Sequence, residues 1–112
     1  NSHLTVGPFN VAVLVRNAAH VVKKGVEQRD TAIKAGALGA TTLIFSRSKL
    51  VMPSSEEDVF KGISSVYNML VSKLDPKEND VIIMGSGENK TNAEIGAKMA
   101  ALELLKFESK NR

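Results

Sequence analysis

The chain has 112 residues, of which 43% are hydrophobic and 24% charged, which is typical of one folded domain and not of a disordered segment. It has no Cys, which excludes disulfides, zinc–thiolate sites and thiol catalysis and favours an intracellular location, cytoplasmic or nuclear. The net charge of +3 is compatible with nucleic-acid binding but does not require it.

Three short apolar runs predict buried strands in chain order. The first covers Phe9–Val15 behind Gly7 and Pro8, the second covers Thr41–Ser46, and the third covers Asp80–Met84. No apolar run approaches the roughly 18 residues that a membrane helix needs. The first residues also lack the charged, apolar and small-residue order of a signal peptide, so we expect no membrane partner.

Helical patterns follow each of these runs. The first extends from Ala18 to about Ala35, although Gly25 weakens its middle. The second begins near residues 54–58, where serines and the acids Glu56, Glu57 and Asp58 suit a helix start, and ends at Leu74. Its apolar stripe comprises Val59, Ile63, Val66, Leu70 and Leu74. The third extends from about Thr91 to Phe107, with Thr91 and Glu94 as a capping box.

The expected order is therefore β-α-β-α-β-α. This alternation predicts one compact α/β domain over residues 1–112, with a single sheet of about three strands and a polar tail from about residue 108. The strand order is left open by the pattern. A parallel, doubly wound sheet would favour nucleotide binding, whereas an antiparallel sheet would favour an RNA-binding fold.

The best candidate site covers residues 85–90. Gly85, Ser86 and Gly87 follow a strand, and Asn89 and Lys90 precede a helix. Permissive residues at such a junction let a backbone approach phosphate, and the helix amides with a lysine favour an anion. The spacing matches neither a P-loop nor the G-x-G-x-x-G fingerprint of dinucleotide-binding domains. The pattern predicts a phosphate-binding turn.

The stretch from Gly85 to Leu105, "GSGENKTNAEIGAKMAALELL", resembles the end of a double-stranded RNA-binding domain. That family closes with a strand, a G-x-G turn, a lysine at the helix start and an alanine-rich helix. The resemblance implies that Lys90 is the main contact to duplex RNA phosphates, assisted by Asn89 and local amides, with Lys98 as a further contact. The basic cluster Lys23, Lys24 and Arg29 on the first helix would extend this positive surface if it lies on the same side.

Two alternatives stay open. The stretches "TAIKAGALGATTLIFS" and "NDVIIMGSGENKTNAEIGAKMAALELL" are similar to the nucleotide-binding domains of universal stress proteins and electron-transfer flavoproteins. That resemblance implies that Gly85, Ser86, Gly87 and Asn89 line a nucleotide phosphate. The other alternative is an assembly module in which the apolar helix face around Val59 to Leu74 buries against a protein partner or a second copy, and the turn is structural.

The sequence offers no catalytic machinery. His3 and His20 have no second metal ligand at useful spacing, and neither G-x-S-x-G nor a supported Ser-His-Asp order is present. We therefore expect a non-enzymatic binding module without cofactor or metal, and the leading hypothesis is salt-sensitive binding of duplex RNA.

Overall fold

The computed structural model describes residues 7–53 and 64–110. Its elements are β1 (Phe9–Val15), the 3-10 helix η1 (Ala19–Val21), α1 (Val26–Lys34), β2 (Gly39–Ser46), β3 (Lys49–Val51), α2 (Ser64–Leu74), β4 (Val81–Gly87) and α3 (Lys90–Lys110). The α/β class is confirmed, with four strands where about three were expected. The expected helix start at residues 54–58, Val59, Ile63 and His3 lie outside the described residues.

The strands form one antiparallel sheet in the order β1-β4-β2-β3. The last of the described strands, β4, lies between β1 and β2, and all of its residues are buried. The sheet is thus not the parallel sheet that the nucleotide-binding resemblance implies. The helix α2 also separates β3 from β4, whereas the RNA-binding resemblance implies three successive strands.

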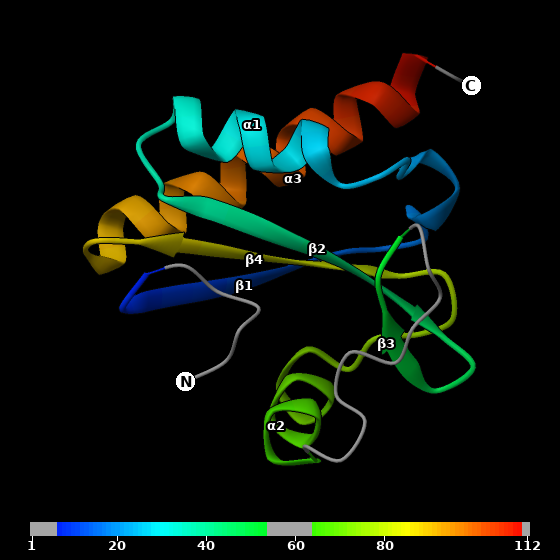
Figure 1. Cartoon of the computed structure of the whole chain (residues 1–112). Helices are drawn as coiled ribbons and strands as arrows, with labels where there is room; N and C mark the ends of the chain where they lie inside the picture. Colours follow the sequence, from blue (N-terminus) through cyan, green and yellow to red (C-terminus); the bar gives the residue numbers. More distant parts are fainter. Residues whose placement is uncertain (1–6, 54–63, 111–112) are drawn as a thin grey trace.

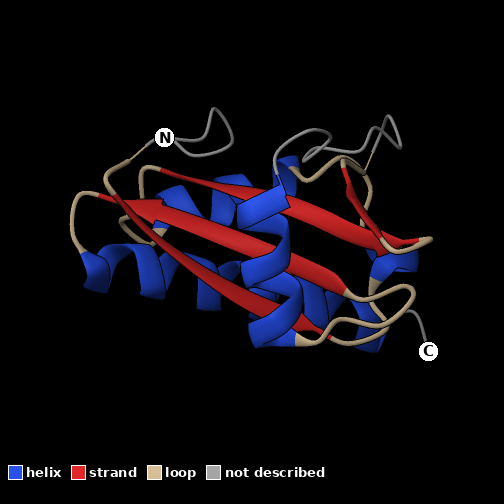
Figure 2. Cartoon of the chain, turned by 90° about the horizontal axis from the view of Figure 1, so that it is seen from below, coloured by secondary structure: helices blue, strands red, loops and turns tan. Residues whose placement is uncertain are grey.

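Helices cover both faces of the sheet. In Figure 1, α1 and α3 lie above the strands and α2 lies below them, and Figure 2 shows α2 crossing the lower face. Successive residues of a strand point to opposite faces, so Ile83 enters the core under α1 and α3 while Ile82 and Met84 enter the core above α2. Leu70 is buried in this lower core, joined by Val66, Tyr67 and Leu74. The described part of the helix face considered for a partner is therefore used inside the molecule.

The first predicted helix is broken at Gly25. That residue has φ +84° and precedes α1, so Lys23 and Lys24 lie in the loop between η1 and α1 and not on a helix. The strand β3 escaped prediction because three residues are too few for a periodic pattern. It pairs with β2 through a turn in which Arg47 and Ser48 have φ +53° and +63°, as in two-residue hairpins of type I′.

The last helix begins one position before the expected start. Its capping residue is Asn89, whose Oδ1 accepts from the Asn92 amide at 2.8 Å. The prediction of a capping box formed by Thr91 and Glu94 was therefore wrong. At its other end, the helix extends past Phe107 to Lys110. Within residues 7–53 and 64–110, no helix combines the length and the apolar character required to cross a membrane.

Candidate functional site

The segment Gly85–Gly87 is the end of a strand and not a turn, which corrects the sequence prediction. Gly85 pairs with Val11 on one side and Ala40 on the other. Ser86 is 1% exposed, and its hydroxyl donates to Asn10 Oδ1 at 2.8 Å. The turn itself consists of Glu88 and Asn89. The three small residues therefore belong to the sheet interior.

The two glycines let α3 rest directly on β4. A Cβ at Gly85 would lie 2.4 Å from the Ala93 carbonyl oxygen and 2.7 Å from the Ala97 nitrogen. A Cβ at Gly87 would lie 2.6 Å from the Ala93 nitrogen. These contacts are to backbone atoms, which cannot move aside as a side chain can. Close helix–strand packing thus accounts for both glycines.

The start of α3 exposes Asn89 and Lys90, but Asn89 already caps its own helix. Lys98 is engaged with Glu94 one turn earlier, at 2.6 Å. The Lys98 ammonium holds the pKa of this Glu94 carboxyl below its usual range, and the charge of Lys90 contributes less. Of the two lysines on α3 that were expected to contact phosphate, Lys98 therefore has an ion-pair partner within its own helix.

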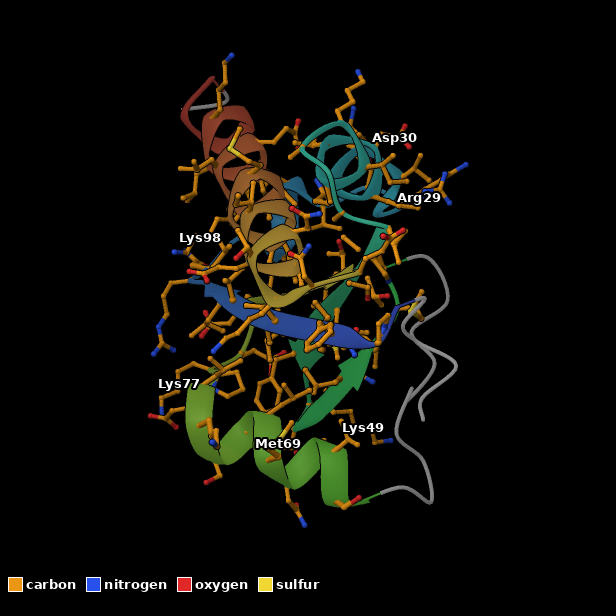
Figure 3. The ribbon with its side chains drawn as sticks, turned by 90° about the vertical axis from the view of Figure 1, so that its left-hand side faces the viewer. Arg29, Asp30, Lys49, Met69, Lys77 and Lys98 are labelled. Atoms are coloured by element: carbon orange, nitrogen blue, oxygen red, sulfur yellow. The ribbon has the colours of Figure 1, made fainter. Side chains whose placement is uncertain are left out.

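The basic residues do not share one surface. Gln28 near the start of α1 bonds Glu103 far along α3, whereas Ala37 just after α1 packs on Gly96, so the two helices are antiparallel. Lys23 and Lys24 consequently lie toward the opposite end of α3 from Lys90. Lys24 and Arg29 line a separate hollow of 140 Å³ beside β2. Figure 3 shows Arg29 and Lys98 on opposite flanks of the helical layer.

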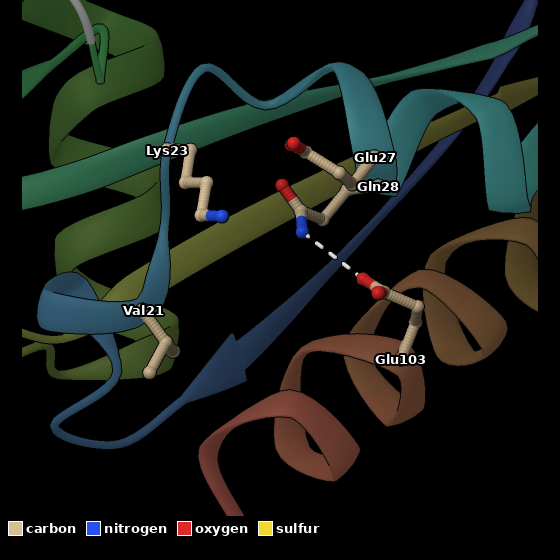
Figure 4. A pocket seen from close by; sticks show the side chains of 5 residues that line it. All are labelled: Val21, Lys23, Glu27, Gln28 and Glu103. Atoms are coloured by element: carbon tan, nitrogen blue, oxygen red, sulfur yellow. Dashed lines mark hydrogen bonds between the residues drawn. The ribbon is translucent and has the colours of Figure 1, made fainter. Parts of the chain in front are cut away.

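A small hollow lies between the loop after η1, α1 and α3 (Figure 4). It has a volume of 80 Å³ and is lined by Val21, Lys23, Glu27, Gln28 and Glu103. Gln28 is only 2% exposed; its Nε2 donates to Glu103 Oε1 at 3.2 Å, and its Oε1 accepts from Thr42 Oγ1 at 3.4 Å. This site has no local signal in the sequence, because Gln28 occurs in the polar run "EQRD", a pattern typical of surface residues.

A larger and more apolar hollow of 250 Å³ is lined by residues of β1, β4 and α2. Its lining includes the polar residues Asn10 from β1 and Lys73 from α2. Its remaining lining residues are Val11, Ala12, Met69, Leu70, Leu74 and Met84. The underside of β1 is therefore incompletely packed. Among the described residues, no group of three His, Asp or Glu side chains is placed to hold a metal ion.

Within residues 7–53 and 64–110, no strand pairs with the outer side of β1, whose partner in the sheet is β4. The seven residues of β1, FNVAVLV, include no charge, Pro or Gly. Phe9 at its start is 46% exposed. Above this edge lies the flank of α3 formed by Glu94, Lys98, Ala101 and Leu105, with Leu105 43% exposed. The side of α3 opposite the sheet adds the exposed residues Ile95, Met99 and Leu102.

A buried carboxylate joins the end of β1 to the loop before β4. Asp80 is 2% exposed; its Oδ1 accepts from the Asn17 amide at 2.8 Å, and its Oδ2 accepts from Arg16 Nη1 and the Lys77 amide, both at 2.7 Å. Burial raises the pKa of Asp80, but the two amides and the Arg16 guanidinium together lower it below its usual value. All of these groups are internal partners, so Asp80 has a structural role.

Comparisons with known proteins place the chain in a family. No curated protein matches it. Among solved structures, it is similar to the hypothetical protein PH0730 from Pyrococcus horikoshii OT3, with 26% identity and a TM-score of 0.74 over 91% of this chain. It covers 53% of that protein, so it corresponds to about half of that relative's length. A family model described as a domain of unknown function, DUF4443, matches residues 6–104. Because this match spans most of the chain, the protein belongs to the DUF4443 family.

Proposed function

We propose that this domain is a non-catalytic assembly module that works inside the cell and pairs with a second copy of itself through β1 and the neighbouring flank of α3. The observation that carries the proposal is the edge of β1. Long, apolar and uncharged edge strands are templates for strand pairing, and monomeric proteins commonly block them with Lys, Pro or a bulge. Within Phe9–Val15 itself there is no Lys or Pro, and Pro8 and Arg16 stand just outside the strand.

The spacing of the layers supports a second copy as the partner. If β1 paired with β1 of another copy about a two-fold axis, the two strands would lie about 4.8 Å apart. Since α3 lies over β1 and β4, such pairing would also bring the two α3 helices side by side, and neighbouring helices usually pack with their axes about 8–10 Å apart. Strand pairing and helix packing would therefore be satisfied by one arrangement.

The charges on this flank are self-complementary. A two-fold axis perpendicular to the sheet makes the two α3 helices antiparallel. Each flank carries Glu94 and Lys98 one turn apart, so Lys98 of one copy can face Glu94 of the other. Ala101 lets the helices approach closely, and Leu105 supplies exposed apolar surface for the contact. The flank thus combines close packing with opposite charges.

We expect Val11→Lys to weaken self-association at least about tenfold, because the two-fold axis would place two buried like charges near one another. The measurement is sedimentation equilibrium over a wide concentration range. Ser65→Lys, on an exposed position of α2, adds the same charge away from β1 and serves as the matched control. A wild-type protein that stays monomeric at the highest concentration, or a Val11→Lys variant that associates like the control, would contradict the proposal.

Duplex RNA is a second candidate partner, favoured by the exposed Lys90 at the positive end of α3. If RNA binds there, Lys90→Ala should weaken binding to every duplex equally and reduce the salt dependence by about one counterion. The measurement is a titration of labelled duplex RNA at two salt concentrations, with Lys106→Ala as an exposed control on the same helix. Equal affinities for the two variants would exclude Lys90 as the contact, and absence of binding at low salt would exclude RNA.

A further inference from the structure

We propose that the hollow beside Gln28 is a binding site for the primary ammonium group of a small molecule. This site is separate from β1 and is independent of the assembly function. Its three contributing segments are the loop after η1, the first turn of α1 and the second half of α3, which bring Lys23, Glu27, Gln28 and Glu103 together (Figure 4). None of these side chains belongs to the proposed assembly surface.

The buried carboxamide of Gln28 is an unusual choice at this position. The core around α1 and α3 is built mainly from alanines and aliphatic side chains, and burying a polar group there is costly unless it is hydrogen-bonded. The bonds to Glu103 and Thr42 use one N–H group and one acceptor position of the amide. A Gln amide has two N–H groups and two acceptor positions, so Gln28 retains capacity toward the hollow.

The charges around the hollow favour a cationic group. The lining contains two carboxylates, Glu27 and Glu103, and one ammonium, Lys23, so it has an excess of negative charge. An ammonium group donates three hydrogen bonds, which suits two carboxylates and the oxygen of Gln28. Lys23 already interacts within the protein, so a ligand with its own acceptor group would share that lysine. The matching class is a small amine, with or without a carboxylate.

The size of the hollow restricts the ligand. A volume of 80 Å³ exceeds the roughly 10–15 Å³ that one water needs, so a group of a few heavy atoms fits. Pockets for nucleotides and drug-sized ligands usually occupy about 300–1,000 Å³, which excludes such ligands here. Molecules of the size of ethanolamine or glycine match both the volume and the charges.

The test is an NMR titration of the ¹⁵N-labelled protein with ethanolamine, glycine and acetate in separate arms. We expect ethanolamine and glycine to shift the amides of residues 23–28 and 103 saturably, with dissociation constants of about 1 mM, and acetate to have no such effect. Glu103→Gln keeps an acceptor for Gln28 but removes the charge, so it should weaken both amines about tenfold without lowering the melting temperature. Glu88→Gln, an exposed position outside the hollow, should change nothing.

Lys23→Met distinguishes the two classes of ligand that carry an ammonium group, amino acids and simple amines. Weaker binding of glycine alone would assign the site to amino acids, and unchanged binding of both would assign it to simple amines; either result supports ammonium recognition. The proposal would be overturned by acetate binding as tightly as the amines. It would be overturned equally if Glu103→Gln left the affinities for both amines unchanged. The absence of saturable shifts at amine concentrations far above 1 mM would also overturn it, because about half the sites should already be filled at about 1 mM.

Discussion

Gly85→Ala is expected to lower the free energy of unfolding by about 3 kcal/mol, since it forces a methyl group into a packed interior. The added Cβ would lie 2.4 Å from the Ala93 carbonyl oxygen, so either α3 must lift from β4 or the sheet must deform. A loss of this size is a large fraction of the roughly 5–15 kcal/mol that holds a typical domain folded. Urea denaturation followed by circular dichroism would measure it.

Two companion variants make this result specific. Ala12→Val adds two methyl groups on the same sheet but beside the 250 Å³ hollow, so its effect should stay within about 1 kcal/mol. Ala97→Gly should not rescue Gly85→Ala, because the nearest atoms, Ala93 O and Ala97 N, belong to the backbone. Wild-type stability of Gly85→Ala, together with weaker binding of a phosphate ligand, would instead restore the phosphate-turn interpretation.

Asp80→Asn is expected to reduce stability by about 3 kcal/mol near neutral pH. The carboxylate accepts hydrogen bonds from two backbone amides and from Arg16, and a buried donor without a partner costs about 1–3 kcal/mol. An Asn side chain has one acceptor oxygen, and its NH₂ group would face a donor. Because the substitution leaves the backbone hydrogen bonds of β4 in place, the variant should remain folded but have a lower free energy of unfolding.

The same carboxylate predicts an acid-dependent stability. The pKa of Asp80 is lower in the folded protein than in the unfolded chain, so its contribution is complete above about pH 4 and is lost as the pH falls through the folded value. Urea unfolding from pH 7 down to pH 2 should therefore show a shallower acid loss for Asp80→Asn than for the wild type. Asp30→Asn, whose carboxyl is 56% exposed and 3.7 Å from Arg29, is the matched control. Parallel curves for wild type and Asp80→Asn would contradict this role.

The main elements could be predicted because their signals are local. The apolar runs at Phe9–Val15, Thr41–Ser46 and Asp80–Met84 correspond to β1, β2 and β4, since burial on both faces demands consecutive apolar residues. In the sequence, Gly25 indicated only a weak point in the middle of a helix and not a break between two segments. Its φ of +84° ends one segment and begins another, which composition alone does not distinguish from a tolerated glycine.

The turn expected at Gly85–Gly87 is a strand end in the structure, because a glycine can serve two purposes that look the same in the sequence. Gly85 and Gly87 could allow a tight turn or the close approach of a helix, and only the position of Ala93 and Ala97 on the facing surface of α3 separates these. Similarly, Arg16 and Asp80 are 64 positions apart, and Gln28 and Glu103 are 75 apart. Contacts of this range leave no local pattern, so the polar network and the hollow became visible only in the folded chain.

The position of β4 between β1 and β2 determines when the protein can fold. Phe9 pairs with Gly87, and Gly39 pairs with Ser86, so neither contact exists until the chain has been synthesised through β4. Of the strand pairings between the described residues, the β2–β3 hairpin is the one that can form before then. Pairings between distant residues close slowly, because the entropy of a long loop is lost before the contacts form. The nascent chain therefore passes through a period in which β1 and β2 both expose apolar backbone edges, and its folding yield should depend on chaperones more than that of a helical domain of equal length.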